Sequence, residues 1–185
     1  MSGMDWQSSA LTRALDRWLA EDIGRGDLTA SALQGKHGHA HWIAKQPGCF
    51  CGGPLVQQLF QRLDPEVSVH LLRDDGAAVE VGDRLLDLEG PATALVAGER
   101  TALNLAMRLS GIATATAELV AQLEGTGVRL ADTRKTTPGL RLLEKYAVRR
   151  GGRLNHRMGL DAPAMLQENH TAWARGLPIA IAASL

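Results

Sequence analysis

The junction between residues 128 and 149 constrains the fold more than any other stretch of this sequence. A short apolar run, residues 128–131, is followed by Asp-Thr-Arg-Lys-Thr-Thr-Pro-Gly-Leu-Arg and then by a helical repeat of apolar residues. This order predicts a strand over residues 128–132 and a helix over residues 138–149, with Arg134 and Lys135 between them. The free N–H groups at a helix N-terminus favour negative charge, so the junction predicts an anion site.

The residues around the junction support this interpretation. Thr137 is a suitable N-cap for the helix, and Pro138 fits its first turn. An isolated Arg-Lys pair is most often a solvated turn, but residues 129–157 hold nine Lys or Arg against two acidic residues, a net charge of +7. Residues 1–128 carry −6 and residues 158–185 carry −1, so the formal net charge of zero conceals a strongly basic segment.

Helical and strand patterns alternate from residue 110 onward, in the order helix, strand, helix, strand, strand, helix. The predicted elements after the first strand and helix are strands at 154–157 and 164–167 and a helix from residue 170. Such alternation predicts parallel pairing and part of an α/β barrel. In a parallel sheet His156 and Arg157 end next to Arg134 and Lys135, so four donors converge on one anionic ligand.

The first half of the chain has a different pattern. It predicts helices at 9–20 and 55–63, a strand at 39–46 and four short strands at 67–72, 77–81, 84–88 and 92–95. Asp-Gly and Gly-Asp turns between the short strands predict a small antiparallel sheet with helices packed on it. A helix at 98–108 and a break at 110–114 follow. We therefore expect an α+β sandwich domain over residues 1–109 and an α/β barrel domain over residues 110–185.

Three groups of side chains resemble metal ligands, but a simpler structural role explains each better. They are the acidic residues of the 21–29 loop, the histidines 37, 39 and 41, and the cysteines 49 and 51. The acidic residues fit a capped turn, and the histidines fit the polar face of a strand. The cysteines lack a second pair of ligands at usable spacing. We expect no metal site from these residues.

Composition narrows the functional classes. A neutral overall charge, with Tyr146 the one aromatic residue of the basic segment, disfavours nucleic-acid binding. No run of about 18 apolar residues occurs, so we expect no membrane span. Two cysteines are too few for a disulfide framework, which favours reduced thiols and a cytoplasmic protein.

Several motifs together resemble the quinolinate phosphoribosyltransferase family, also called nicotinate-nucleotide pyrophosphorylases. They lie at residues 21–29, 98–104, 110–114, 132–141, 144–148 and 151–160, in the family's order. The resemblance runs from about residue 11 to about residue 173. It implies an α/β sandwich domain followed by an open α/β barrel, in a homodimer whose active sites borrow residues from the partner.

The resemblance also implies a reaction and a set of site residues. Family members convert quinolinate and phosphoribosyl pyrophosphate to nicotinate mononucleotide, pyrophosphate and CO₂ in NAD biosynthesis, with Mg²⁺ as cofactor. By the motif match, Arg134 and Lys135 are the expected catalytic and substrate-binding residues, and His156 and Arg157 are expected to bind substrate. Arg100 resembles the arginine that reaches into the partner's site.

Two departures from the family pattern matter. Gln167 stands where a substrate-facing lysine is expected, and the lost charge corresponds to about one or two powers of ten in affinity or rate. The chain ends after three predicted barrel strands, so we expect an incomplete barrel that lacks the later strands and their Mg²⁺-binding acids, and a chain that is inactive alone. A related phosphoribosyltransferase with another acid substrate, and a non-catalytic dimerising or dicarboxylate-binding fragment, are the alternatives.

Overall fold

The computed structural model describes residues 4–161 and 164–184. The chain is an α+β protein built around a three-stranded antiparallel sheet in the order β1 (His37–Ile43), β5 (Arg84–Pro91) and β3 (Ser68–Leu71). A two-stranded antiparallel pair, β2 (Gly48–Cys49) and β4 (Ala78–Val79), extends this layer. The prediction of a small antiparallel sheet in the first half of the chain is confirmed.

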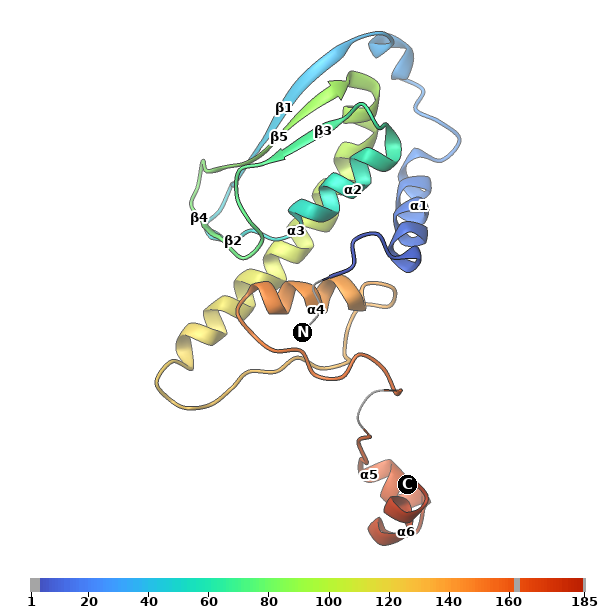
Figure 1. The fold of residues 1–185 in the computed structure, drawn as a ribbon, viewed down its shortest axis with the longest axis vertical. Helices are drawn as coiled ribbons and strands as arrows, with labels where there is room; N and C mark the ends of the chain where they lie inside the picture. Colours follow the sequence, from blue (N-terminus) through green and yellow to red (C-terminus); the bar gives the residue numbers. More distant parts are fainter. Residues whose placement is uncertain (1–3, 162–163, 185) are drawn as a thin grey trace.

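Helices cover one side of this sheet (Figure 1). Helix α2 (Gly53–Leu63) and the long helix α3 (Ala92–Gln122) pack on the strands and on each other, while α1 (Ser9–Ile23) packs beside them. A short 3₁₀ turn, η1 (Ala30–Leu33), leads into β1. The centre of the core consists of fully buried apolar side chains from α2 and β5, including Leu55, Leu59, Phe60 and Leu86. The predicted helices at 9–20 and 55–63 are therefore confirmed.

Helix α3 corrects two predictions, because it runs without interruption through the predicted strand at 92–95 and the predicted break at 110–114. The hydroxyl groups of Ser110 and Thr114 form hydrogen bonds with a distant segment. The Ser110 hydroxyl accepts a hydrogen bond from the Cys51 amide at 2.9 Å and donates one to the Cys51 carbonyl. The Thr114 hydroxyl accepts from the Cys49 amide at 2.8 Å. These residues look like helix breakers in sequence, but they are helix-packing residues in the fold.

The region after α3 contains less regular structure than its sequence pattern predicts. The predicted strands at 128–132 and 154–157 reduce to one isolated parallel bridge between Ala131 and Leu154. The described residues of the 164–167 segment form no strand. The parallel direction of the pairing is correct, but the extent of the strands is wrong.

Helix α4 (Arg141–Arg150) begins three residues later than predicted. Its N-cap position is Leu140 and not Thr137, because residues 137–140 close a turn in which the Leu140 amide donates to the Thr137 carbonyl at 3.0 Å. Gly139 adopts φ +83°, a left-handed conformation that is strained for other residues. The turn places α4 across the lower half of α3 (Figure 1).

Two short helices, α5 (Glu168–Trp173) and α6 (Leu177–Ala182), contact each other and lie apart from α4 (Figure 1). Gln167 is the N-cap residue of α5: its side chain accepts from the third helical residue, His170. Glu168 is the first residue of this helix, two residues before the predicted start at residue 170. No helix among the described residues is both long and apolar enough to cross a membrane.

Candidate anion-binding site

The residue that organises the basic segment is an acid. The Asp132 side chain is only 7% exposed, and its Oδ1 accepts from the Lys145 Nζ at 2.5 Å and from the His156 backbone amide at 2.7 Å. Its Oδ2 accepts from the Asn155 Nδ2 at 2.6 Å, and the same Asn155 Nδ2 donates to the Lys145 carbonyl. Asp132 thus joins the end of the first predicted strand to the second and to α4.

A second acid holds the loop that carries Arg134 and Lys135. Glu144, buried on α4, accepts from the Arg108 guanidinium of α3 at 2.5 Å and from the Thr137 amide at 3.0 Å. Burial alone raises the pKa of Glu144, but hydrogen bonds from Thr137 and Arg108, together with the charge of Arg108, outweigh it and hold this pKa below its usual value. Glu144 is therefore an ionised structural group at neutral pH.

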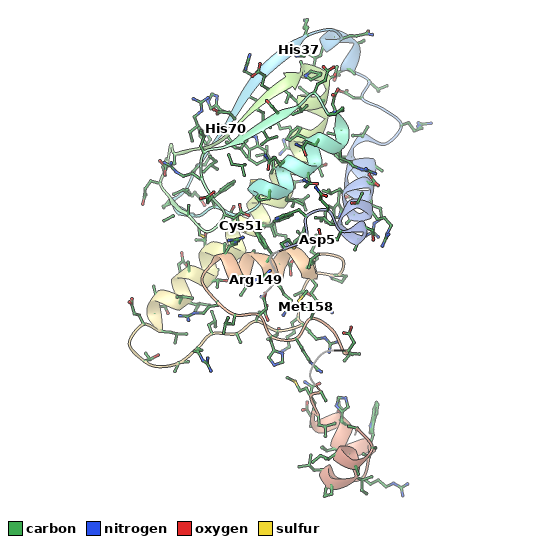
Figure 2. All side chains as sticks on the ribbon, viewed as in Figure 1. Asp5, His37, Cys51, His70, Arg149 and Met158 are labelled. Carbon is green, nitrogen blue, oxygen red and sulfur yellow. The ribbon has the colours of Figure 1, made fainter. Side chains whose placement is uncertain are left out.

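Arg141 ties the two halves of the site together through oxygen atoms of the loops. Its Nε donates to the Thr136 hydroxyl at 3.1 Å, and its two terminal nitrogens donate to the Met158 carbonyl at 3.2 Å and the Arg134 carbonyl at 3.5 Å. Met158 is labelled on the side of α4 that faces away from the sandwich in Figure 2. Because these donors are used internally, Arg141 has a structural role despite its position in the predicted anion site.

The predicted site residues Arg134 and Lys135 follow one chain segment, and His156 and Arg157 follow a second segment beside it, as predicted. The bridge between Ala131 and Leu154 and the bond from Asp132 to the His156 amide bring the two segments together. Lys135 and His156 are exposed. The half-buried Arg134 has a buried Nε with no hydrogen-bond partner among the described residues. The fold thus leaves donors at this edge, while their binding of substrate stays a prediction.

Three other predictions about single residues have different outcomes. Arg157 is half-buried and also belongs to this edge. Gln167 is exposed and caps α5, which lies apart from α4 (Figure 1). The exposed Arg100 lies on α3, eight residues or about 12 Å along the helix axis before Arg108.

Sequence reasoning missed the residues that build the site: Asp132, Lys145, Asn155, Glu144 and Arg108. A signal was present, because Asp132 and Glu144 are the two acids of a segment with nine cations. Each accepts from a basic side chain. An acid isolated among many cations is thus more informative here than any one of the cations.

A separate network attaches α4 to the sandwich. The Asp75 carboxylate accepts from the Gly52 and Gly53 amides at 2.9 and 2.8 Å, at the N-terminus of α2, and from the Tyr146 hydroxyl of α4 at 2.7 Å. Trp6 packs edge-on against the Tyr146 ring at a centroid distance of 4.9 Å. Burial, together with the charge of Asp75, raises the pKa of Tyr146, so its hydroxyl stays a donor.

The residues weighed as metal ligands have ordinary structural positions. His37, His39 and His41 are exposed on β1. Cys49 and Cys51 are free and buried, and burial raises the pKa of both thiols; Cys51 lies at the lower edge of the sandwich (Figure 2). No group of three or more His, Cys, Asp or Glu within residues 4–161 and 164–184 could hold a metal ion.

Mg²⁺, which the family resemblance implies, does not fit the acids of the basic segment. Mg²⁺ prefers carboxylate and water oxygens in octahedral geometry. Both carboxylates of this segment, Asp132 and Glu144, already accept from cationic side chains and backbone amides. These two carboxylates therefore do not form a Mg²⁺ site.

Two family models match consecutive parts of the chain. Residues 27–110 match the N-terminal domain of quinolinate phosphoribosyl transferase, and residues 112–183 match its C-terminal domain. Among curated relatives, the probable nicotinate-nucleotide pyrophosphorylase [carboxylating] of Synechocystis is 46% identical over 90% of this chain and 57% of its own length. That of Bacillus subtilis is 47% identical over 88% of this chain and 56% of its own length.

Solved structures agree with the sequence comparisons. The nicotinate-nucleotide pyrophosphorylase from Francisella tularensis superposes with a TM-score of 0.89 at 36% identity, over 95% of this chain and 62% of that one. NadC from Streptococcus pyogenes superposes with a TM-score of 0.90, also at 36% identity, over 100% of this chain and 65% of that one. The chain thus spans a little over half the length of the curated relatives named here. With both domain models matched in order, this chain belongs to the quinolinate phosphoribosyltransferase family.

Proposed function

We propose that this chain forms the quinolinate-binding part of an enzyme that transfers a phosphoribosyl group to quinolinate, giving nicotinate mononucleotide, pyrophosphate and CO₂. One observation carries the proposal: two pairs of basic residues, Arg134 with Lys135 and His156 with Arg157, end at one edge of the fold. Because the chain belongs to this family, we assign that edge to the binding of quinolinate. The activity belongs to the longer relatives by name, and its extension to this chain is the proposal.

The chemistry of the substrates suits this arrangement. Quinolinate carries two adjacent carboxylates, and a planar guanidinium and an ammonium bind such groups by charge-assisted hydrogen bonds. Fixing both carboxylates aims the ring nitrogen at the ribose carbon that it attacks, and positioning of this kind is a large part of catalysis. Pyrophosphate leaves as charge accumulates on its oxygens, which the same cationic edge stabilises. We assign Arg134 and Lys135 the catalytic and binding roles, and His156 and Arg157 binding roles.

The finer architecture is part of the same proposal. We assign residues 1–109 to the sandwich domain and residues 110–185 to part of an open α/β barrel. The matches of the two family models to residues 27–110 and 112–183 support this division, although helix α3 continues across it. In this arrangement Gln167 replaces a charged donor with a neutral one.

A homodimer with Arg100 directed at the partner's site also belongs to the proposal. The supporting observation is an open groove of about 1360 Å³ between β1 and α3, which includes none of the four site cations. Val96 and Met107, two of its lining residues, are 49% and 57% exposed. Large exposed apolar surfaces often mark protein interfaces. Sedimentation tests this: we expect a dimer at micromolar concentration, and a monomer would contradict it.

Phosphoribosyl pyrophosphate as second substrate, Mg²⁺ as cofactor and a cytoplasmic location complete the proposal. The reduced, buried cysteines support the location. The metal has no ligand set among the described residues, so we expect quinolinate binding without appreciable turnover from this chain alone. Nicotinate mononucleotide formed at an ordinary enzymatic rate by the purified chain, with phosphoribosyl pyrophosphate and Mg²⁺ present, would contradict this expectation.

Isothermal calorimetry tests the binding directly. We expect weak, salt-sensitive binding of quinolinate, because an exposed ionic site is screened by salt. Arg134→Ala should weaken binding by about tenfold, the loss of one charge-assisted hydrogen bond. Arg13→Ala, on exposed α1 residue Arg13, is the matched control and should bind as the parent does. No heat at millimolar quinolinate would refute the proposal.

A second candidate function rests on Gln167. If its neutral side chain reflects another acid substrate, a panel of pyridine and benzene mono- and dicarboxylates should include a ligand that binds more tightly than quinolinate. A non-catalytic dicarboxylate-binding role would show the same binding without turnover even when the remaining length of a relative is supplied as a second polypeptide.

A further inference from the structure

We infer that Asp132, Lys145 and Asn155 form a positioning clamp that sets the spacing between the two cation pairs, and through it the preference for a dicarboxylate. The inference rests on the proposed function, because it explains how that site selects its ligand. None of the three residues is assigned to bind substrate. They act through the chain segments that carry Arg134 and His156.

Both oxygens of Asp132 are already occupied, so this carboxylate is not available to a ligand. Oδ1 accepts hydrogen bonds from the Lys145 ammonium and the His156 backbone amide, and Oδ2 accepts one from the side-chain amide of Asn155. The bond from His156 comes from its backbone and not from its imidazole. Asp132 therefore fixes where the chain runs at residue 156 and leaves the imidazole for other contacts.

Little else in the described structure holds the two segments in register. Ala131 and Leu154 form a single isolated bridge, and no strand ladder continues from it. Arg141 adds one further link, through the carbonyls of Arg134 and Met158. The distance between the cation pairs therefore depends on the clamp, which lies between that bridge and the cations.

The clamp is anchored in the fold by α4. The Lys145 side chain is 2% exposed, and Asn155 also donates to the Lys145 carbonyl. A buried ion pair contributes little stability compared with an apolar pair of similar volume, so stability alone does not explain it. The hydrogen bonds that the Asp132 side chain accepts from the His156 amide and from Asn155 do, however, specify one alignment of the segments that they join. A ligand with two adjacent carboxylates needs that alignment, whereas a monocarboxylate needs only one cation pair.

Two double variants separate this role from simple stabilisation. Asp132→Ala with Lys145→Met removes the link without leaving a buried charge unpaired. Asp132→Asn with Lys145→Met removes the same charges but keeps an oxygen that can accept from the His156 amide. Lys36→Met, at an exposed lysine, is the control for loss of a lysine. Each protein is measured at a temperature where circular dichroism shows that it is folded.

Two quantities are measured for each protein. Calorimetry gives the ratio of the dissociation constants of nicotinate, a monocarboxylate, and quinolinate, a dicarboxylate. Hydrogen exchange followed by NMR gives the protection of the His156 amide without any ligand. We expect the alanine double variant to lower the ratio by about tenfold and to lose the protection, because one of two charged contacts is misplaced. The asparagine double variant and Lys36→Met should keep both.

Other outcomes overturn the inference. If the folded alanine and asparagine double variants both keep, or both lose, the ratio and the amide protection, the Asp132–Lys145 pair only stabilises the fold. If the alanine variant does not fold, Asn155→Ala takes its place in the comparison: it removes the link to Asp132 Oδ2, so the ratio should fall, while the His156 amide, still bonded to Asp132, should keep its protection. If the parent binds no quinolinate, the proposed function fails, and amide protection alone decides about the clamp: equal protection in both double variants refutes it, and loss in the alanine variant alone supports it.

Discussion

Replacing Asp75 with alanine should destabilise the whole protein, because one carboxylate joins the sandwich to α4. The substitution leaves three good donors without their acceptor: the Gly52 and Gly53 amides and the Tyr146 hydroxyl. A buried donor that loses its partner costs about 1–3 kcal/mol, and a negative charge at a helix N-terminus adds up to about 1 kcal/mol. Asp75 is half-buried, so water replaces part of the loss.

We therefore expect the free energy of unfolding to fall by about 3 kcal/mol, toward the low end of that sum. In a chain of this length each kcal/mol lowers the melting temperature by about 2–4 °C, so the expected fall is about 6–12 °C. Urea denaturation followed by circular dichroism gives the free energy, and calorimetry gives the melting temperature.

Two further variants make the test specific. Asp74→Ala removes the neighbouring carboxylate, which is exposed and has no side-chain partner within the described residues, and should change stability by less than about 0.5 kcal/mol. Asp75→Asn keeps an oxygen for the α2 amides but loses the charge and the oxygen that accepts from the Tyr146 hydroxyl, so it should fall between the two. An Asp75→Ala variant as stable as Asp74→Ala would refute the assigned role of the network.

Two other expectations concern stability. The pKa of Glu144 is held below the ordinary glutamate value of 4.5. Its contribution to the free energy of unfolding is therefore complete above that value and is lost as the pH falls through the lower pKa of the folded state. Glu144→Gln should be less stable than the parent at pH 7, and the unfolding curves of the two proteins should converge in acid. Gly151→Ala would place a Cβ 2.5 Å from the Ala113 carbonyl oxygen, which should cost about 2 kcal/mol or more in urea denaturation. Its control, Gly111→Ala, meets no atom within 4 Å in α3 and should stabilise the helix by about 0.5–1 kcal/mol; equal effects of the two glycine substitutions would contradict this packing.

Local patterns in the sequence were sufficient for much of the first half of the chain. The apolar periodicity of residues 9–20 and 55–63 predicted α1 and α2. Turn residues between alternating segments predicted β3, β4 and β5. In these elements the signal is local, because the direction of each side chain follows from its position within one helix or strand.

The continuity of α3 could not be predicted in the same way. Ser110 and Thr114 resemble helix-breaking residues, since hydroxyl side chains compete for backbone hydrogen bonds. Their hydroxyls instead accept from the amides of Cys51 and Cys49, which lie 59 and 65 residues away along the chain. The partners that make the helix continuous become visible only when the chain is folded.

The candidate site also combines features that the sequence predicts with features that only the folded structure shows. The order of the chain determined that Arg134 follows one predicted strand and that His156 lies near the end of the next, and parallel pairing was enough to predict that the two residues lie near each other. Only the tertiary structure decided which charges are available to a ligand. Lys145 looks like a surface lysine of an amphipathic helix, yet the Asp132 carboxylate lies 2.5 Å from its ammonium and removes it from solvent. A sequence pattern reports the direction of a side chain within its own element, whereas its pairing and burial depend on the atoms that other elements place against it.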